Sequence, residues 1–145
     1  MKILVAIDDS KFSQAAVQAL IAQIPPSNAE VRVVHVVEPI TVASPPQMAA
    51  GYAPELAELV KEGRTLVEQT AQTLRAAGFK VDAAVEKGDV REKILESAGD
   101  WGASLIVLGS HGHRGVRRFL LGSVAESVAR HAACSVEIVR LPARQ

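Results

Sequence analysis

Five short runs of β-branched and aliphatic residues, with segments of helical character between them, constrain the fold of this chain more than any other feature. Several runs, such as ILVAI and LIVL, are almost continuously apolar, which is typical of parallel strands covered by helices on both faces. The alternation of strands and helices predicts an α/β fold, an open, doubly wound, five-stranded parallel sheet with helices on both faces. The predicted strands are residues 3–7, 31–37, 80–86, 105–108 and 135–139.

The ends of the helical segments carry recognisable capping residues. Ser10 is placed to cap a helix that continues to residue 21. Asp89, with Glu92 three residues later, is placed to cap another helix, which ends near Gly102. These signals separate the first and third helices from the strands that precede them.

Two further helices are predicted, at residues 54–77 and 122–131. Gly78, followed by Phe79, fits a left-handed C-cap with an apolar contact at the end of the longer helix. Residues 41–53, which contain three prolines or glycines and few charges, are predicted as a long mobile loop at the ligand edge of the sheet. Such a loop could be a lid or a plain surface insertion.

Length and composition exclude several classes of protein. The 145 residues fit a single domain, 1–145, and no apolar stretch approaches the roughly 20 residues that span a bilayer. Sixteen basic and sixteen acidic residues balance, and only five residues are aromatic, so we expect neither membrane nor nucleic-acid binding. The single cysteine, Cys134, fits a reducing compartment, and with no signal peptide evident we expect a cytoplasmic protein.

A glycine-rich segment, GSHGHRGVRRFLLGSVAES, follows the fourth predicted strand directly and leads into a helix. Glycine allows the backbone to approach an anion and to reach positive φ, and a helix start offers unpaired N–H groups at its positive end. This pattern predicts a phosphate cradle, with turn glycines in a solvated basic loop as the alternative. The densest basic cluster of the chain lies in the same segment and consists of His111, His113, Arg114, Arg117 and Arg118.

The spacing of the glycines identifies the kind of cradle. Neither GxxxxGK[ST] nor GxGxxG occurs, so the segment is neither a P-loop nor a dinucleotide fingerprint. The segment reads Gly109-x2-Gly112-x9-Gly122-Ser123, which resembles the G-x2-G-x9-G-[ST] motif of the ATP-binding universal stress proteins. The resemblance extends from ILVAIDDS at the start to LLGSVAESVARHAACSV near the end. It implies the Rossmann-like fold of adenine nucleotide alpha hydrolases.

The resemblance implies a ligand and a set of contacts. In that family the motif holds the ribose and triphosphate of ATP, an aspartate after the first strand contacts the nucleoside, and the end of the second strand meets the adenine. Mg²⁺ is expected to arrive with ATP, and a homodimer is expected through the C-terminal strand. The residues that occupy these positions here are Asp8, Val36, Gly109, Gly112, Gly122, Ser123 and Val124, the last through its amide.

Other polar residues admit simpler roles. Asp8 and Asp9 could bind a metal together, but Asp9 could equally face solvent or cap the first helix. His35 lies near the expected adenine position, although a histidine in an apolar strand is more often a core residue. Glu137 departs from the family pattern in the last strand, where it could face solvent or blunt the sheet edge. Cys134 and Trp101 are interpreted as core residues.

Three classes of function remain open on these grounds. The first is a regulatory stress-response module that binds ATP and hydrolyses it slowly at most. The second is an ATPase or nucleotidyl-transferring enzyme, which would need a positioned base or a metal cage. The third is a stress protein that acts by dimerisation and protein binding without a nucleotide, and such family members lack this glycine pattern. The intact motif favours the first class.

Overall fold

The computed structural model describes residues 1–39, 46–112 and 121–141, and the side chains of these residues except 46–54. All five strands pair in parallel, in the order β3-β2-β1-β4-β5, which confirms the predicted α/β fold. The elements follow one another as β1 (Lys2–Ala6), α1 (Lys11–Gln23), the 3-10 helix η1 (Pro26–Asn28), β2 (Glu30–Val37), α2 (Pro46–Ala76), β3 (Lys80–Lys87), α3 (Val90–Trp101), β4 (Leu105–Gly109), α4 (Ser123–His131) and β5 (Ser135–Val139).

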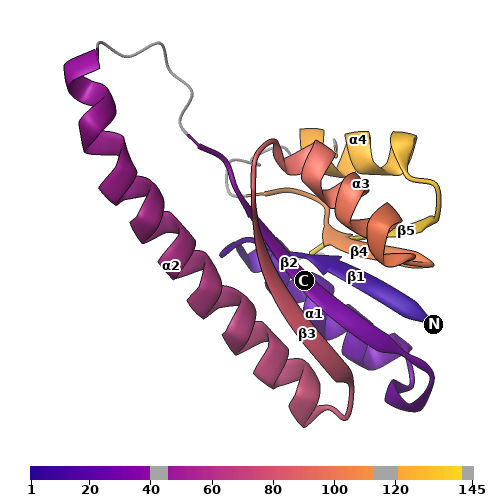
Figure 1. The fold of residues 1–145 in the computed structure, drawn as a ribbon. Helices are drawn as coiled ribbons and strands as arrows, with labels where there is room; N and C mark the ends of the chain where they lie inside the picture. The colour runs from indigo at the N-terminus through magenta and orange to yellow at the C-terminus, as the bar shows by residue number, and fades with distance from the viewer. Residues whose placement is uncertain (40–45, 113–120, 142–145) are drawn as a thin grey trace.

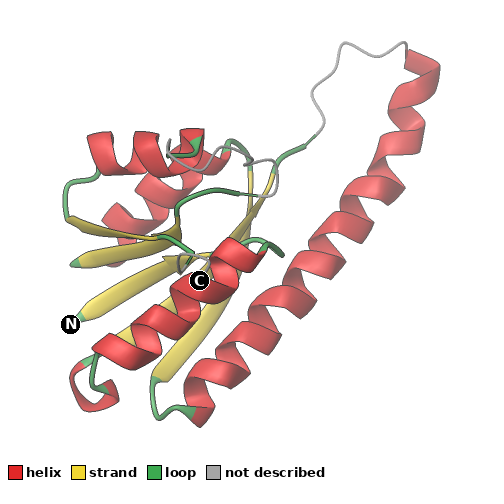
Figure 2. Ribbon diagram, turned by 180° about the vertical axis from the view of Figure 1, so that it is seen from behind, coloured by secondary structure: helices red, strands yellow, loops and turns green. Residues whose placement is uncertain are grey.

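Helices cover both faces of the sheet, as Figures 1 and 2 show. Alternate residues of each strand point to opposite faces, so Ile3 and Val5 face α1 and α2, whereas Leu4 and Ala6 face α3 and α4. Two hydrophobic cores result, one on each face. Among the described helices, none combines the length and the apolar character that a bilayer crossing requires.

The predicted caps form at the ends of the helices. The Ser10 hydroxyl accepts a hydrogen bond from the backbone N–H of Ser13, and the Asp89 carboxylate accepts one from Glu92. Gly78 adopts the left-handed conformation at φ 101°, and the N–H of Phe79 donates to the carbonyl oxygen of Leu74. These local contacts start α1 and α3 at the carboxyl edge of the sheet and return the chain from α2 into β3.

The prediction for the second helix was wrong at its beginning. Helix α2 begins at Pro46 and not near Pro54, so residues 46–53 are helical where a loop was predicted. A proline is well suited to the first helical position, and Gln, Met and Ala, which follow Pro46, are strong helix formers. The N-terminal turns of α2 extend beyond the sheet (Figure 1). Residues 41–45 of the predicted loop lie outside the described residues. The sequence also predicts Leu59 on the apolar side of this helix, yet the residue is 39 % exposed.

The sheet reverses its strand order at β1, which lies between β2 and β4. The connections after β1 and β4 leave toward opposite faces of the sheet, because α1 packs with one core and α4 with the other. In such sheets the carboxyl ends of the strands on either side of the reversal diverge and leave a crevice. Asp8 and Gly109 therefore lie at the edge where a ligand is expected.

Candidate functional site

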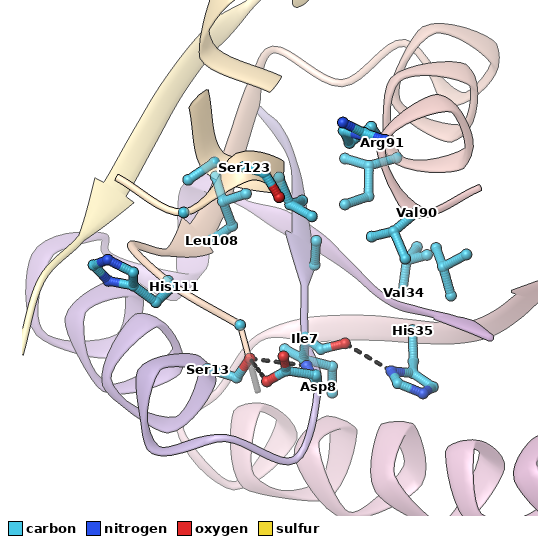
Figure 3. A pocket seen from close by; sticks show the side chains of 18 of the residues that line it. Ile7, Asp8, Ser13, Val34, His35, Val90, Arg91, Leu108, His111 and Ser123 are labelled. Atoms are coloured by element: carbon cyan, nitrogen blue, oxygen red, sulfur yellow. Dashed lines mark hydrogen bonds between the residues drawn. The ribbon is translucent and has the colours of Figure 1, made fainter. Parts of the chain in front are cut away.

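A cavity of about 710 Å³ lies at this edge, between the first turns of α3 and α4. This volume is typical of a site for a nucleotide-sized ligand. Figure 3 shows the cavity with Asp8 and Ser13 on one side of it and Ser123 and Arg91 on another. All seven predicted site residues line it: Asp8, Val36, Gly109, Gly112, Gly122, Ser123 and Val124.

Asp8 is held in place by the first turn of α1. Its Oδ1 accepts hydrogen bonds from the backbone N–H of Ser10 and from the hydroxyl of Ser13, both at 2.9 Å. The backbone N–H of Asp8 donates in turn to the Ser13 hydroxyl oxygen at 2.8 Å. Its Oδ2 lies on the side of Gly112, 3.1 Å from the position that a Cβ atom would occupy there. The carboxylate is therefore fixed at the boundary between the cavity and the glycine segment.

Val36 presents backbone groups in the direction of the cavity. The last pair between β1 and β2 joins Ala6 to Val34, and the N–H of Ile7 donates to the Val34 carbonyl oxygen at 2.9 Å. Backbone N–H and C=O groups of every second residue in a strand point to the same neighbouring strand. Those of Val36, two residues after Val34, therefore also point to the β1 side, at a level beyond the last paired residue of β1. Val36 thus offers one donor and one acceptor where the two strands diverge.

The first turn of α4 supplies backbone donors. Its N-cap, Gly122, has no side chain that could cap the first amides of the helix. The N–H of Gly122 donates to the carbonyl oxygen of Ser110 at 2.8 Å, so this amide is already paired within the chain. The amides of Ser123 and Val124 remain at the positive end of the helix, where they favour an anion.

The motif glycines are required for close packing and not for positive φ. The described glycines with positive φ are Gly78, Gly88 and Gly102, all outside the motif. A Cβ atom on Gly109 would lie 2.7 Å from Cβ of Phe12, and one on Gly122 would lie 3.1 Å from the backbone of Ser110 and His111. The expectation of positive φ was therefore wrong for these positions. Instead, the absence of a side chain lets Gly109 approach α1 and lets Gly122 approach the backbone of Ser110 and His111.

The two histidines near the cavity have structural contacts. Nδ1 of His35 donates to the carbonyl oxygen of Ile7 at 2.8 Å, and its ring packs beneath Gly63 of α2. His111 packs its ring against Phe12, with 5.2 Å between centroids, and its Nδ1 lies 3.1 Å from the Ser110 hydroxyl oxygen. The other members of the predicted basic cluster, at positions 113, 114, 117 and 118, lie outside the described residues.

The sequence analysis missed the wall that α3 contributes. Val90, Arg91 and Ile94 line the cavity together with Glu38, which follows β2. Oε1 of Glu38 accepts a hydrogen bond from the N–H of Val90 at 3.2 Å and so ties the end of β2 to the start of α3. The sequence did contain a signal for this wall. The Asp89 cap begins α3 directly after β3, and this places the first turn of α3 at the same carboxyl edge of the sheet as Asp8.

No cluster of three or more His, Cys, Asp or Glu side chains suited to a metal ion occurs among the described residues. Asp9 is exposed, in line with the simpler interpretation of that residue. Trp101 and Cys134 both pack, half-buried, against the core on the α3 and α4 face, as expected.

Glu137 contradicts the expectation that it faces solvent, whereas its inward direction on the edge strand β5 is compatible with the second expectation, a blunted sheet edge. It pairs in register with Val107, whose side chain lies in the core on the α1 and α2 face, so Glu137 points toward the same helical layer. The residue is half-buried, and its Oε2 is enclosed without a hydrogen-bond partner in the described part of the chain. It does not lie on a solvent face.

Comparison with known proteins identifies the family. The profile of the Universal stress protein family matches residues 1–140. The chain belongs to the universal stress protein family. Among curated relatives of this universal stress protein, YxiE of Bacillus subtilis is 32 % identical over 145 residues, which cover 96 % of this chain and 98 % of the relative.

Solved structures of similar proteins share the whole fold. The hypothetical protein MJ0577 of Methanocaldococcus jannaschii superposes with a TM-score of 0.87 at 27 % identity, over 99 % of this chain and 97 % of that chain. A universal stress protein solved in complex with cyclic AMP superposes with a TM-score of 0.71 at 23 % identity, over 96 % of each chain.

Proposed function

We propose that this universal stress protein is a regulatory stress-response module that binds ATP in the cavity between α3 and α4. The observation that carries the proposal is the convergence on one cavity of all seven residues that the family resemblance implies, from Asp8 to Val124. A universal stress protein of the same fold has been solved with cyclic AMP, an adenine nucleotide, and this supports the class of ligand.

The proposed contacts follow from the polar groups that line the cavity. The amides of Ser123 and Val124, with the Ser123 hydroxyl, bind phosphate oxygens at the positive end of α4. Asp8, fixed by Ser10 and Ser13, accepts hydrogen bonds from the ribose hydroxyls. The backbone N–H and C=O of Val36 pair with the polar edge of the adenine. Gly109, Gly112 and Gly122 let these groups converge.

Mg²⁺ is proposed to enter with the phosphates. Oxygen ligands suit this ion, and Mg²⁺ usually keeps several waters and binds through one or two protein groups plus phosphates. The Ser123 hydroxyl, which lines the cavity at the proposed phosphate position, is the protein oxygen that would hold the ion together with the phosphates and water. Hydrolysis is proposed to be slow at most, since His35 is engaged with the Ile7 carbonyl oxygen and packed beneath α2.

The wider setting of the protein is proposed on the same grounds. The chain acts as one domain, residues 1–145, in the cytoplasm, and forms a homodimer through the edge strand β5. An edge strand presents unpaired backbone groups, which a second copy of the same strand can satisfy. The alternative is a protein that dimerises and binds partners without a nucleotide. The following experiment distinguishes this alternative from the ATP-binding module.

The first test is to denature freshly purified protein, identify any released nucleotide, and repeat thermal melts with ATP, AMP, GTP and cyclic AMP. A ligand at about 100 times its Kd adds about 2.7 kcal/mol and raises the Tm by several degrees. Released ATP, or a shift with ATP above the shifts with the other ligands, supports the proposal. A protein free of nucleotide that shows no shift with any of the four ligands contradicts it.

A further inference from the structure

Arg91 occupies a place in the cavity that the motif does not account for. It is the second residue of α3 and lines the cavity from the α3 side, whereas Ser123 lines it from α4 (Figure 3). Its Nη2 lies 3.7 Å from Oδ2 of Asp89, and its side chain keeps 49 % of its surface exposed. Arg91 is therefore oriented by one carboxylate yet still presents a planar guanidinium to a ligand.

The position of Arg91 in its helix is locally unfavourable. A cation in the first turn of a helix is repelled by the positive end of the helix dipole. The N-cap, Asp89, already accepts a hydrogen bond from the N–H of Glu92, so helix α3 does not need Arg91 to begin. Residues that oppose a local preference are expected chiefly at functional sites.

The surroundings of Arg91 favour a flat aromatic ring over a phosphate. Val90 and Ile94 of α3 pack with Val34 and Val36 in one apolar cluster, which forms this side of the cavity. Glu38, also in the lining, places a carboxylate next to Val90 and disfavours a second anion there. The amides suited to phosphate belong to α4. A guanidinium beside an apolar wall is the arrangement that stacks on an aromatic face.

We propose that Arg91 stacks on the base of the bound nucleotide and thereby determines how tightly the nucleoside part is held. This inference rests on the proposed function, since it requires a base beside Val36. Arg91 contributes through its planar face and not through its charge alone. Asp89 acts as a positioning residue that holds the guanidinium at the cavity wall.

The test compares ligands that contain the base with one that does not. Affinities for adenosine, ATP and inorganic tripolyphosphate are measured by calorimetry for the wild type, Arg91→Ala, Arg91→Lys and the control Arg130→Ala. Arg130 is an exposed α4 residue that is also paired with a carboxylate, Glu126, and it lies outside the cavity lining. Circular dichroism and a thermal melt check that each variant is folded.

Arg91→Ala is expected to weaken adenosine and ATP binding equally, by about 3- to 30-fold, and to leave tripolyphosphate unchanged. Arg91→Lys should lose nearly as much, because lysine keeps the charge without the planar group. Unchanged adenosine affinity in Arg91→Ala, or a loss confined to ATP and tripolyphosphate, overturns the inference and leaves the proposed function intact. A wild-type protein that binds neither adenosine nor ATP overturns both.

Discussion

Nδ1 of His35 donates a hydrogen bond to the carbonyl oxygen of Ile7 at 2.8 Å, at the point where β1 and β2 separate. Because a carbonyl oxygen only accepts, the proton must reside on Nδ1. The imidazole satisfies a backbone group that β2 no longer pairs, directly before Asp8. The His35 side chain thus supports the floor of the cavity from the α2 face of the sheet.

Gly63→Ala is expected to disturb this contact. The added Cβ atom would lie 2.8 Å from Cδ2 of His35, so the ring must shift away from the Ile7 carbonyl. Overpacking of this kind costs about 1–3 kcal/mol, to be measured by urea unfolding. The matched control is Gly99→Ala, since an added Cβ atom in α3 meets nothing within 4 Å and should stabilise the helix by roughly 0.5–1 kcal/mol. Equal effects of the two changes would contradict the role of His35.

The Ser123 amide can be tested separately from its hydroxyl. Ser123 is the first residue of α4, where proline is tolerated, and Gly122 precedes it with the extended ψ of 158° that proline requires. Ser123→Ala removes only the hydroxyl, whereas Ser123→Pro also removes the N–H. If both groups bind phosphate, Ser123→Pro should weaken ATP binding by about 10- to 100-fold more than Ser123→Ala, measured by calorimetry. Equal affinities in the two variants would exclude the amide as a ligand.

Glu137→Leu is expected to stabilise the protein. The Oε2 atom is enclosed without a partner in the described part of the chain, and the side chain points toward the α1 layer. Removing an unsatisfied buried polar group should raise the free energy of unfolding by roughly 1–3 kcal/mol in chemical denaturation. Glu126→Gln, at an exposed carboxylate on α4, serves as the control and should change stability by less than about 0.5 kcal/mol. A loss of stability in Glu137→Leu that grows with protein concentration would instead place this carboxylate in a dimer contact.

Arg32 connects β2 to β3 and to the end of α3. Its Nε lies 2.7 Å from Oδ1 of Asp82, and its guanidinium lies 4.7 Å from the ring centroid of Trp101. The hydrogen bond that the Arg32 guanidinium donates to the Asp82 carboxylate raises the pKa of Arg32 above its ordinary value. A raised folded-state pKa adds stability that is fully present below the unfolded-state pKa and is lost only as the pH rises through the folded-state value. The contribution of the Arg32 cation is therefore constant from neutral to mildly alkaline pH.

Arg32→Ala should lower the free energy of unfolding by about 1 kcal/mol at both pH 7 and pH 9. The effect is small because the ion pair of Arg32 with Asp82 is partly exposed, and the stacking of Arg32 on Trp101 adds to the contribution of that pair. Fluorescence of Trp101, the single tryptophan, reports the unfolding in urea. Arg32→Lys keeps the charge but loses the planar stack, so it should recover only part of the loss. A destabilisation that disappears between pH 7 and pH 9 would contradict this account.

Local sequence signals were sufficient for the strands and the helix caps. The continuous apolar runs mark strands buried on both faces, and Ser10 and Asp89 begin their helices because short polar side chains accept hydrogen bonds from nearby amides. The start of α2 was missed because Gly and Pro were weighed as helix breakers, whereas Pro46 occupies the first helical position.

The sequence by itself determined the fold class, because strand periodicity is a local property of the chain, and its resemblance to the family implied the seven residues of the proposed site. Only the tertiary structure decided what those residues contact. The motif glycines are small because Phe12 and the backbone of Ser110 approach them, and the Gly122 amide is taken by Ser110. The α3 wall with Arg91 and the support from His35 depend on the strand order β3-β2-β1-β4-β5. That order is set by which elements bury one another's apolar faces, a long-range result that no short motif encodes.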